Sequence, residues 1–182
     1  MQIVLPSKSL LQKTGDVDYF DWNYRFPIKY IQLYRFKRII WLLGKKKYPA
    51  LLEIGTGSGI LLPELAKHCE KLFACDIHSN YDRIHLLLEK YSIDNYDIGR
   101  QNIEHTSYND KSFDAIVAVS VLEFVQDLPG AISEIKRILK DDGVFITICP
   151  MSSRFLDIVL GLYSKKKPKE EFGEARSLVG KS

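Results

Sequence analysis

The stretch Leu51-Leu52-Glu53-Ile54-Gly55-Thr56-Gly57-Ser58-Gly59-Ile60 places an acidic residue after a short apolar run, followed by three glycines on alternate positions. A helix-like apolar pattern begins at once, so the stretch predicts a strand, a tight turn and a helix N-terminus. Glycine suits positions where the backbone takes a positive φ or passes close to a ligand. The free N–H groups at the start of the helix then face whatever occupies the turn. An ordinary glycine-rich turn without a ligand is the alternative interpretation.

The spacing of the glycines distinguishes two kinds of nucleotide-binding turn. The dinucleotide fingerprint is G-x-G-x-x-G, and Ile60 stands where its third glycine would fall. The pattern from Glu53 to Gly59 is instead E-x-G-x-G-x-G, which resembles the class I S-adenosylmethionine (SAM)-dependent methyltransferases. The resemblance continues through Ser112–Val117 (SFDAIV) and Glu134–Lys140 (EIKRILK). It covers about residues 50–150 and is closest to the small-molecule, type 11-like branch.

From residue 50 onward, strand-like and helix-like segments alternate, which predicts an α/β fold with a doubly wound, mainly parallel sheet. The expected strands are 50–54, 72–75, 96–100, 113–119 and 144–149. The expected helices are 60–70, a helix capped by Ser79 or Asn80 that ends near Tyr91, and 128–139. The resemblance implies a Rossmann-like sheet with strand order 3-2-1-4-5. The family's closing C-terminal β-hairpin is expected to be absent, because only 19 residues follow Tyr163.

Composition sets broad limits on the function. A chain of 182 residues with 46% hydrophobic and 27% charged residues fits one globular body with a real core. A net charge of +3 is too small to argue for nucleic acid. The three cysteines form no C-x-x-C pair, so neither a metal site nor a disulfide framework is predicted, and Cys75 and Cys149 are expected to be buried. No apolar run approaches the ~18 residues of a membrane span, and no signal peptide is evident, so a cytoplasmic protein is expected.

The chain divides into an N-terminal cap or lid (1–48), a SAM-binding domain (49–163) and a polar tail (164–182). Within the cap, a helix is expected between Pro27 and Gly44. The segment from Trp22 to Lys47 holds eight Lys or Arg and no Asp or Glu. It is read either as a helix that covers the sheet or as a basic, aromatic surface for an anionic substrate or a membrane. A second copy or a partner chain is expected at the exposed fifth-strand edge.

Polar residues at the ends of successive strands predict a nucleoside site, because parallel sheets bind ligands beyond the carboxyl ends of their strands. Asp76 ends the second strand, and its carboxylate can accept from both ribose hydroxyls. The resemblance implies that Ile77 packs on adenine, that Asn102 and Ile103 stand where Asp and a small residue are usual, and that Ser120 approaches the methionyl group. It also places Glu53 near the cofactor's ammonium group or a water. The predicted cofactor-binding residues are Glu53, Gly55, Thr56, Gly57, Gly59, Asp76, Ile77, Asn102, Ile103 and Ser120.

Methyl transfer from a sulfonium demands alignment and shelter from water rather than a catalytic pair. His78 and Glu123 are the two acid–base candidates at the expected rim, and a solvated loop residue is the alternative for each. Phe124 stands where the family often has His. The residues Ser120–Glu123 (SVLE) lack the Asn/Asp-Pro-Pro-aromatic motif of DNA amino-methyltransferases, which argues against a nucleic acid substrate.

The sequence therefore predicts an enzyme, a SAM-dependent methyltransferase that acts on a small-molecule or lipid- or glycan-linked acceptor and leaves S-adenosylhomocysteine as product. A SAM-binding regulatory or partner subunit without turnover is the alternative. An NAD-binding oxidoreductase is disfavoured by Ile60. The acceptor and the methylated atom stay open.

Overall fold

A computed structural model describes residues 3–14, 18 and 20–149. The segment 155–163 (FLDIVLGLY), whose apolar pattern predicts a helix, lies outside these residues. The tail at 164–182 and the expected absence of a C-terminal hairpin also fall outside them.

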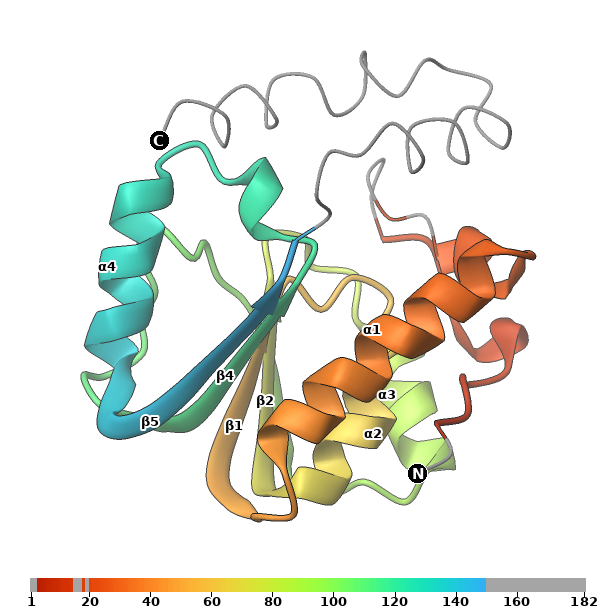
Figure 1. The fold of residues 1–182 in the computed structure, drawn as a ribbon, viewed down its shortest axis with the longest axis horizontal. Coiled ribbons are helices and arrows are strands. Elements are labelled where there is room, and N and C mark those ends of the chain that lie inside the picture. Colours follow the sequence, from red (N-terminus) through yellow and green to blue (C-terminus); the bar gives the residue numbers. More distant parts are fainter. Residues whose placement is uncertain (1–2, 15–17, 19, 150–182) are drawn as a thin grey trace.

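The core of the molecule is a five-stranded parallel sheet with the order β3-β2-β1-β4-β5 (Figure 1). Its strands are β1 (Tyr48–Ile54), β2 (Cys69–Asp76), β3 (Tyr96–Arg100), β4 (Phe113–Val119) and β5 (Leu139–Ile148). The predicted fold class and strand order are confirmed. Strand β4 is apolar on both faces, and its residues 115–118 are fully buried, as expected for a central strand covered on both sides.

Helices cover the two faces of the sheet unequally (Figure 1). One face carries α1 (Ile28–Leu43), α2 (Leu62–Leu65) and α3 (Asp82–Lys90), and the other carries α4 (Leu128–Ile138). Short 3₁₀ turns complete the described chain: η1 (Lys8–Leu10), η2 (Phe20–Tyr24), η3 (Ala66–His68) and η4 (Leu122–Phe124). Two separate clusters of buried residues form the core, one on each face of the sheet.

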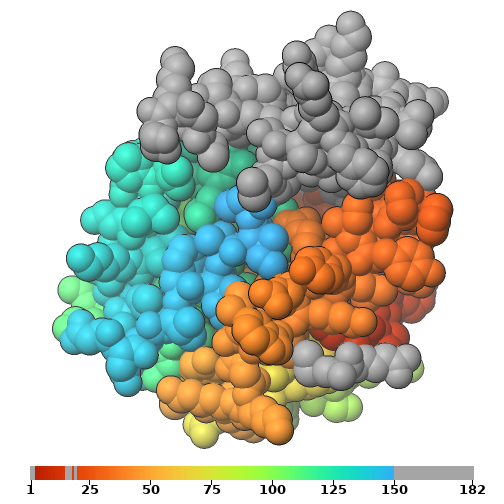
Figure 2. Space-filling view, in the orientation of Figure 1, coloured from red at the N-terminus to blue at the C-terminus, as the bar shows by residue number. Residues whose placement is uncertain are grey.

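Helix α1 agrees with the sequence prediction at both ends. It begins after Pro27 and ends at Gly44, whose φ of 71° and N–H bonds to the last turn form the C-terminal cap. Its apolar stripe, including Phe36, Ile40 and Leu43, is buried against the sheet. On the surface the helix runs beside β5 (Figure 2). Among the described residues, no helix combines the length and apolar character needed to cross a bilayer.

Two predicted helices have different bounds in the structure, and each difference has a local physical reason. The helix expected over 60–70 shortens to α2 and η3, because β2 already pairs with β1 at Cys69. Helix α3 begins at Asp82 rather than after a Ser79 or Asn80 cap. In that loop, Asn80 N donates to His78 Nδ1 instead.

The last strand and the helix before it also differ from expectation. Strand β5 begins at Leu139 rather than Val144, and the register of its pairing with β4 shifts between Phe113 and Ala115. The sequence of the Asp142-Gly143 pair predicts a turn before the strand, but the pair lies within β5. The apolar spacing of residues 128–139 predicts Ile132 on the inner face of α4, but this residue is exposed.

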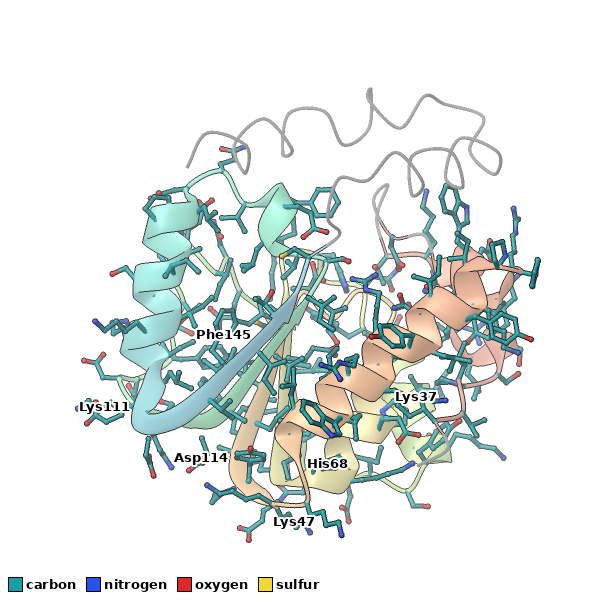
Figure 3. All side chains as sticks on the ribbon, viewed as in Figure 1. Lys37, Lys47, His68, Lys111, Asp114 and Phe145 are labelled. Atoms are coloured by element: carbon teal, nitrogen blue, oxygen red, sulfur yellow. The ribbon has the colours of Figure 1, made fainter. Side chains whose placement is uncertain are left out.

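Asp114, the one acidic residue of β4, is paired at the amino-terminal end of the strands. Its Oδ2 accepts from Ala50 N at 3.0 Å, and its Oδ1 lies 2.8 Å from Lys140 Nζ. Figure 3 shows Asp114 near the end of the sheet opposite the loops that follow β4. This acidic residue therefore supports the sheet and does not contribute to the rim.

Candidate cofactor and acceptor site

A cavity of about 970 Å³ lies at the carboxyl ends of the strands. Its walls come from the loops after β1, β2, β3 and β4, from α1 and from the segment before α1. Of the twelve residues that the sequence suggested for the site, eleven line this cavity, and Gly59 is the exception. The structure therefore gathers residues from four strand ends around one space.

The glycine-rich turn is fixed to the neighbouring strand β2. Gly55, Gly57 and Gly59 all have positive φ, at 70°, 51° and 77°. Both Gly55 N and Thr56 N donate to the carbonyl oxygen of Cys75, at 2.8 and 3.2 Å. A Cβ on Gly55 would lie 2.5 Å from Cγ2 of Val121, so a side chain does not fit there. Gly59 instead packs on the helix side of the turn, close to Leu62 and Ile84.

Glu53 is a buried carboxyl beneath this turn. Its Oε2 accepts from Thr56 Oγ1 at 2.7 Å, and the side chain lines the cavity. Burial raises the pKa of Glu53 to about 8, and the nearby charge of Asp76 acts in the same direction. Glu53 therefore holds its proton at neutral pH when no cation lies beside it.

Asp76 closes the turn from the end of β2. Its Oδ2 accepts from Gly57 N at 2.8 Å, and its Oδ1 accepts from Ile77 N at 2.7 Å. Oδ1 also accepts a long hydrogen bond from His78 N at 3.4 Å, so Oδ2 is the oxygen that keeps a second lone pair for a ligand. The Ile77 side chain is 67% exposed although it is apolar, and it lines the cavity. His78 Nε2 lies 3.1 Å from Gly57 O, so this imidazole also supports the turn.

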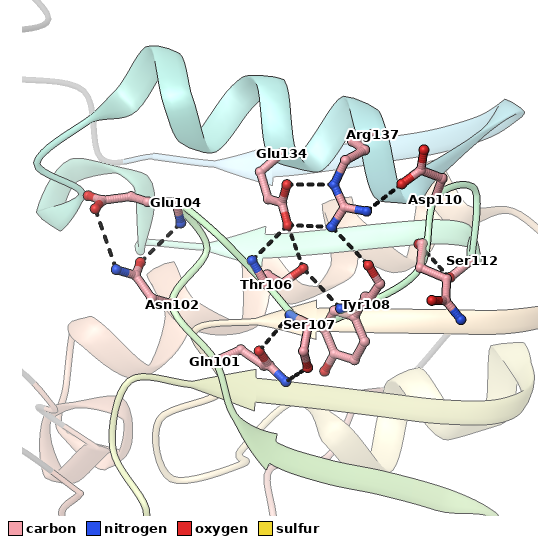
Figure 4. Close-up of polar contacts among 11 residues, drawn as sticks. Gln101, Asn102, Glu104, Thr106, Ser107, Tyr108, Asp110, Ser112, Glu134 and Arg137 are labelled. Carbon is pink, nitrogen blue, oxygen red and sulfur yellow. Dashed lines mark hydrogen bonds and ion pairs between the residues drawn. The ribbon is translucent and has the colours of Figure 1, made fainter.

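The loop after β3 is held by a polar network that leads to α4 (Figure 4). Asn102 Oδ1 accepts from Glu104 N at 3.0 Å. Glu134 Oε1 accepts from Thr106 N at 2.7 Å, and Arg137 bonds both oxygens of Glu134. The Arg137 hydrogen bonds lower the pKa of Glu134 to about 2. This network fixes the loop that presents Asn102 and the buried Ile103 to the cavity.

The far side of the cavity is built around Arg35, which the sequence placed among surface cations. Arg35 Nη2 donates to Ser120 Oγ and, at 3.4 Å, to the carbonyl oxygen of Ile148. Its Nη1 donates to Gln32 Oε1 at 3.1 Å. Burial lowers the pKa of Arg35, while the negative charge of Glu123 opposes that shift. Helical periodicity offered no signal for this inward orientation, because Arg35 adjoins the buried stripe without belonging to it.

Glu123, in η4, has an unusual environment. Both carboxyl oxygens are buried, and neither has a hydrogen-bond partner among the described residues. Burial raises its pKa, whereas its own backbone N–H, the positive charge of Arg35 and the nearby side chains of Ser120 and Cys149 act in the opposite direction. Ser120 precedes this turn with a φ of 53°. Such strained or unpaired groups cluster at functional sites.

The two cysteines that were expected to be buried differ in the structure. Cys75 is buried as expected, whereas Cys149 is exposed and lines the cavity. Cys149 comes directly after the last residue of β5 and lies at the rim of the sheet. The apolar sequence of the strand therefore does not predict whether this residue is buried. In the ranges that the structure describes, His, Cys, Asp and Glu side chains form no group of three that would hold a metal ion.

A parallel sheet of this order, with a glycine-rich turn after its first strand, defines a Rossmann-like nucleotide-binding fold. The chain belongs to the methyltransferase domain family, whose model matches residues 52–147, more than half of the chain. This match confirms the class I SAM-dependent methyltransferase resemblance, and SAM is the cofactor of that class.

One curated relative and two solved structures illustrate the family. The chain is 32% identical over 106 residues to "Arginine-hydroxylase NDUFAF5, mitochondrial" of Danio rerio; the match spans 56% of this chain and 30% of the relative. A SAM-dependent methyltransferase from Aquifex aeolicus is 20% identical, with a TM-score of 0.56 over 63% of each chain. Phosphoethanolamine N-methyltransferase 1 of Haemonchus contortus, solved with phosphoethanolamine and S-adenosylhomocysteine, is 17% identical, with a TM-score of 0.60 over 70% of this chain and 28% of that one.

Proposed function

We propose that the chain binds SAM in this cavity and transfers its methyl group to a small-molecule or lipid- or glycan-linked acceptor. The observation that carries the proposal is the convergence of Glu53, Asp76, Asn102 and Ser120 on one cavity of about 970 Å³. This volume lies within the range of about 300 to 1,000 Å³ typical of small-molecule sites. Bound SAM would supply the electrophilic methyl group.

The roles proposed for the cofactor-binding residues follow from the hydrogen-bond acceptors and the exposed surface that they leave available to a ligand. Asp76 accepts from one ribose hydroxyl through the free lone pair of Oδ2, and a second hydroxyl can replace the long 3.4 Å contact from His78 N to Oδ1. The exposed Ile77 packs on adenine. Asn102 Oδ1, which accepts once from Glu104, has a second lone pair for the adenine amino group. Gly55 and Gly57 let the backbone approach the ligand, and Thr56 orients Glu53 toward the ammonium group.

Acceptor activation falls to Glu123 in this proposal. A buried carboxyl with a raised pKa and no partner can accept a proton from a hydroxyl or amine. His78 is the weaker of the two candidates, because its Nε2 already contacts Gly57 O. Arg35, fixed by Ser120, offers a positive charge next to Glu123 for an anionic group of the cofactor or acceptor.

The name of the curated relative supports a second candidate. A protein named as an arginine hydroxylase shares this domain at 32% identity, so hydroxylation of an arginine side chain is the competing activity. The chain spans about a third of that relative's length. A SAM-binding subunit without turnover stays the third reading.

The remaining predictions stand as part of the proposal. The family match lies inside the predicted 49–163 domain. A cytoplasmic location stays a prediction, while the relative's name contains the word mitochondrial.

Strand β5 pairs only with β4 among the described strands, which supports a second copy or a partner chain at that edge. The absence of a nucleic acid substrate also stays a prediction.

Calorimetry with SAM, S-adenosylhomocysteine and NAD tests the site, followed by labelled-methyl transfer from SAM into cell extract. Binding of both SAM compounds, together with labelled product, is expected. Gly55→Val should abolish binding through its clash with Val121, whereas Gly99→Ala, where an added Cβ meets nothing within 4 Å, is the control. NAD binding alone would overturn the proposal. SAM binding without labelled product favours a subunit without turnover, and oxygen added to arginine, detected by mass spectrometry, favours the hydroxylase.

A further inference from the structure

The solvent side of α1 carries a stripe of large aromatic side chains. Tyr30, Tyr34 and Trp41 are 63%, 65% and 64% exposed. Spacings of four and seven residues place them on one side of the helix. Phe26, just before the helix, is 73% exposed and packs edge-on against Tyr30 at a ring-centroid distance of 6.0 Å. Aromatic rings of this size are seldom left in water without a partner.

Cations are interleaved with these rings. Lys37 lies between Tyr34 and Trp41 on the same side, and it is exposed on α1 (Figure 3). The Arg38 guanidinium lies 4.6 Å from the centroid of the Trp41 ring. Lys45, Lys46 and Lys47 follow the end of the helix and are exposed. Residues 22–47 contain no acidic side chain, so all the charged side chains of this segment are positive.

The opposite side of α1 is already occupied. Phe36 and Ile39 are buried in the core, while Gln32 and Arg35 line the cavity. Helix α1 therefore cannot turn its apolar stripe toward a lipid bilayer without leaving the sheet. Any partner of the helix must bind through its outer rings and cations.

We propose that the outer face formed by Tyr30, Tyr34, Lys37, Arg38 and Trp41 docks the protein on an anionic membrane surface. Tyr and Trp favour the headgroup region, where the ring is partly buried and its polar atom stays hydrated. Lys and Arg are attracted to anionic lipids over about a Debye length. Exposed rings and positive charge on one convex face fit a lipid surface. They fit a nucleic acid strand less well, because strands bind in grooves.

Docking through α1 also has a consequence for the cavity. The same helix borders the cavity through Gln32 and Arg35, so the acceptor side would lie close to the lipid surface. This arrangement suits a lipid-linked acceptor. The inference about the acceptor rests on the proposed methyl transfer. The docking surface itself does not depend on that function.

Co-sedimentation of the full chain with phosphatidylcholine vesicles, with and without phosphatidylserine, tests the proposal. Binding is expected only with phosphatidylserine and should weaken as salt is added. The double variant Lys37→Gln/Arg38→Gln should bind roughly 25-fold more weakly, at about fivefold for each cation. Tyr34→Ser/Trp41→Ser should weaken binding roughly tenfold or more. The matched control is Arg83→Gln/Lys90→Gln, which removes two exposed cations from α3.

Several outcomes would overturn the docking surface: no vesicle binding, equal binding to uncharged vesicles, equal losses in the α3 control, or tighter binding to a single-stranded oligonucleotide. SAM calorimetry on the same variants separates this proposal from the proposed function. The outer residues do not line the cavity, so these variants should bind SAM like the unmodified chain. Vesicle binding without any SAM binding would reject the methyltransferase proposal alone.

Discussion

The two sides of the cavity differ in how their polar groups are satisfied. On the side proposed to hold adenosine, Asp76 accepts from the backbone N–H groups of Gly57 and Ile77, and the turn is bonded to β2. On the acceptor side, Glu123 has two buried oxygens and no partner among the residues that the structure describes. The carboxylate of Asp76 is therefore hydrogen-bonded without a ligand, whereas the carboxyl oxygens of Glu123 have no hydrogen-bond donor among the described residues.

The difference indicates which interactions serve the fold and which serve a ligand. A buried polar group without a partner costs about 1–3 kcal/mol, and more when it is charged. Replacing Glu123 by an apolar residue would remove that cost, so its presence is better explained by a ligand that supplies the missing donor. Asp76 supports the turn and the ligand at once, so its two roles must be separated by experiment.

The largest effect is expected for Glu123→Gln. Glutamine keeps the shape but cannot take a proton, so labelled-methyl transfer should fall roughly 10²- to 10⁴-fold. SAM affinity, measured by calorimetry, should stay unchanged. Turnover of the unmodified chain should rise with pH through a value above the ordinary carboxyl range, because burial raises the pKa of Glu123. Glu89→Gln, on the exposed side of α3, is the control; full turnover in Glu123→Gln would remove the contrast between the two sides.

An intermediate effect is expected for Asp76→Asn. The amide oxygen can still accept from Gly57 N, but the charge that holds the ribose is lost. A hydrogen bond to a charged group is worth about 1.5–3 kcal/mol, so affinity for SAM should fall roughly 10- to 100-fold. S-adenosylhomocysteine should lose as much, because it has the same ribose. Asp94→Asn, which changes an exposed carboxylate, serves as control. An unchanged Kd of Asp76→Asn for SAM would show that Asp76 supports the turn and does not hold the ligand.

The effect expected for Glu53→Gln concerns stability rather than binding or turnover. The pKa of Glu53 is about 8 in the folded chain against an ordinary 4.5. The folded state thus holds this proton more tightly than the unfolded state, and stability should fall as pH rises from about 4.5 to 8. Glutamine should flatten that slope by up to one proton per molecule, as measured by urea unfolding across this range. The exposed Glu70→Gln should leave the slope unchanged.

Sequence reasoning succeeded where the determining interactions are local. The glycine turn needs positive φ within five residues, and helix α1 is bounded by Pro27 and Gly44. The buried strand β4 is apolar throughout apart from Asp114. Each of these signals lies within a short window of residues, so the fold and the cofactor side could be predicted.

The acceptor side could be predicted only in part. Ser120 and Glu123 were expected at the rim, and both line the cavity, but the role of Arg35 was missed because its contacts join distant residues. Arg35 bonds Ser120 across 85 positions and Ile148 across 113, and no local signal indicates either contact. The start of β2 was missed for a related reason: its first residues include the exposed Glu70 and become strand by pairing with β1. The isolation of Glu123 likewise became visible only in three dimensions.

Consecutive residues of α1 face different surroundings: Tyr34 is exposed to solvent, Arg35 contacts Ser120, and Phe36 lies in the core. Each residue turns the helix by 100°. One residue inserted or deleted before Tyr34 would shift the preceding part of the outer face out of line with the rest. The helix therefore tolerates substitutions on its outer side far better than changes in length, and its spacing from Pro27 to Gly44 is itself a functional constraint.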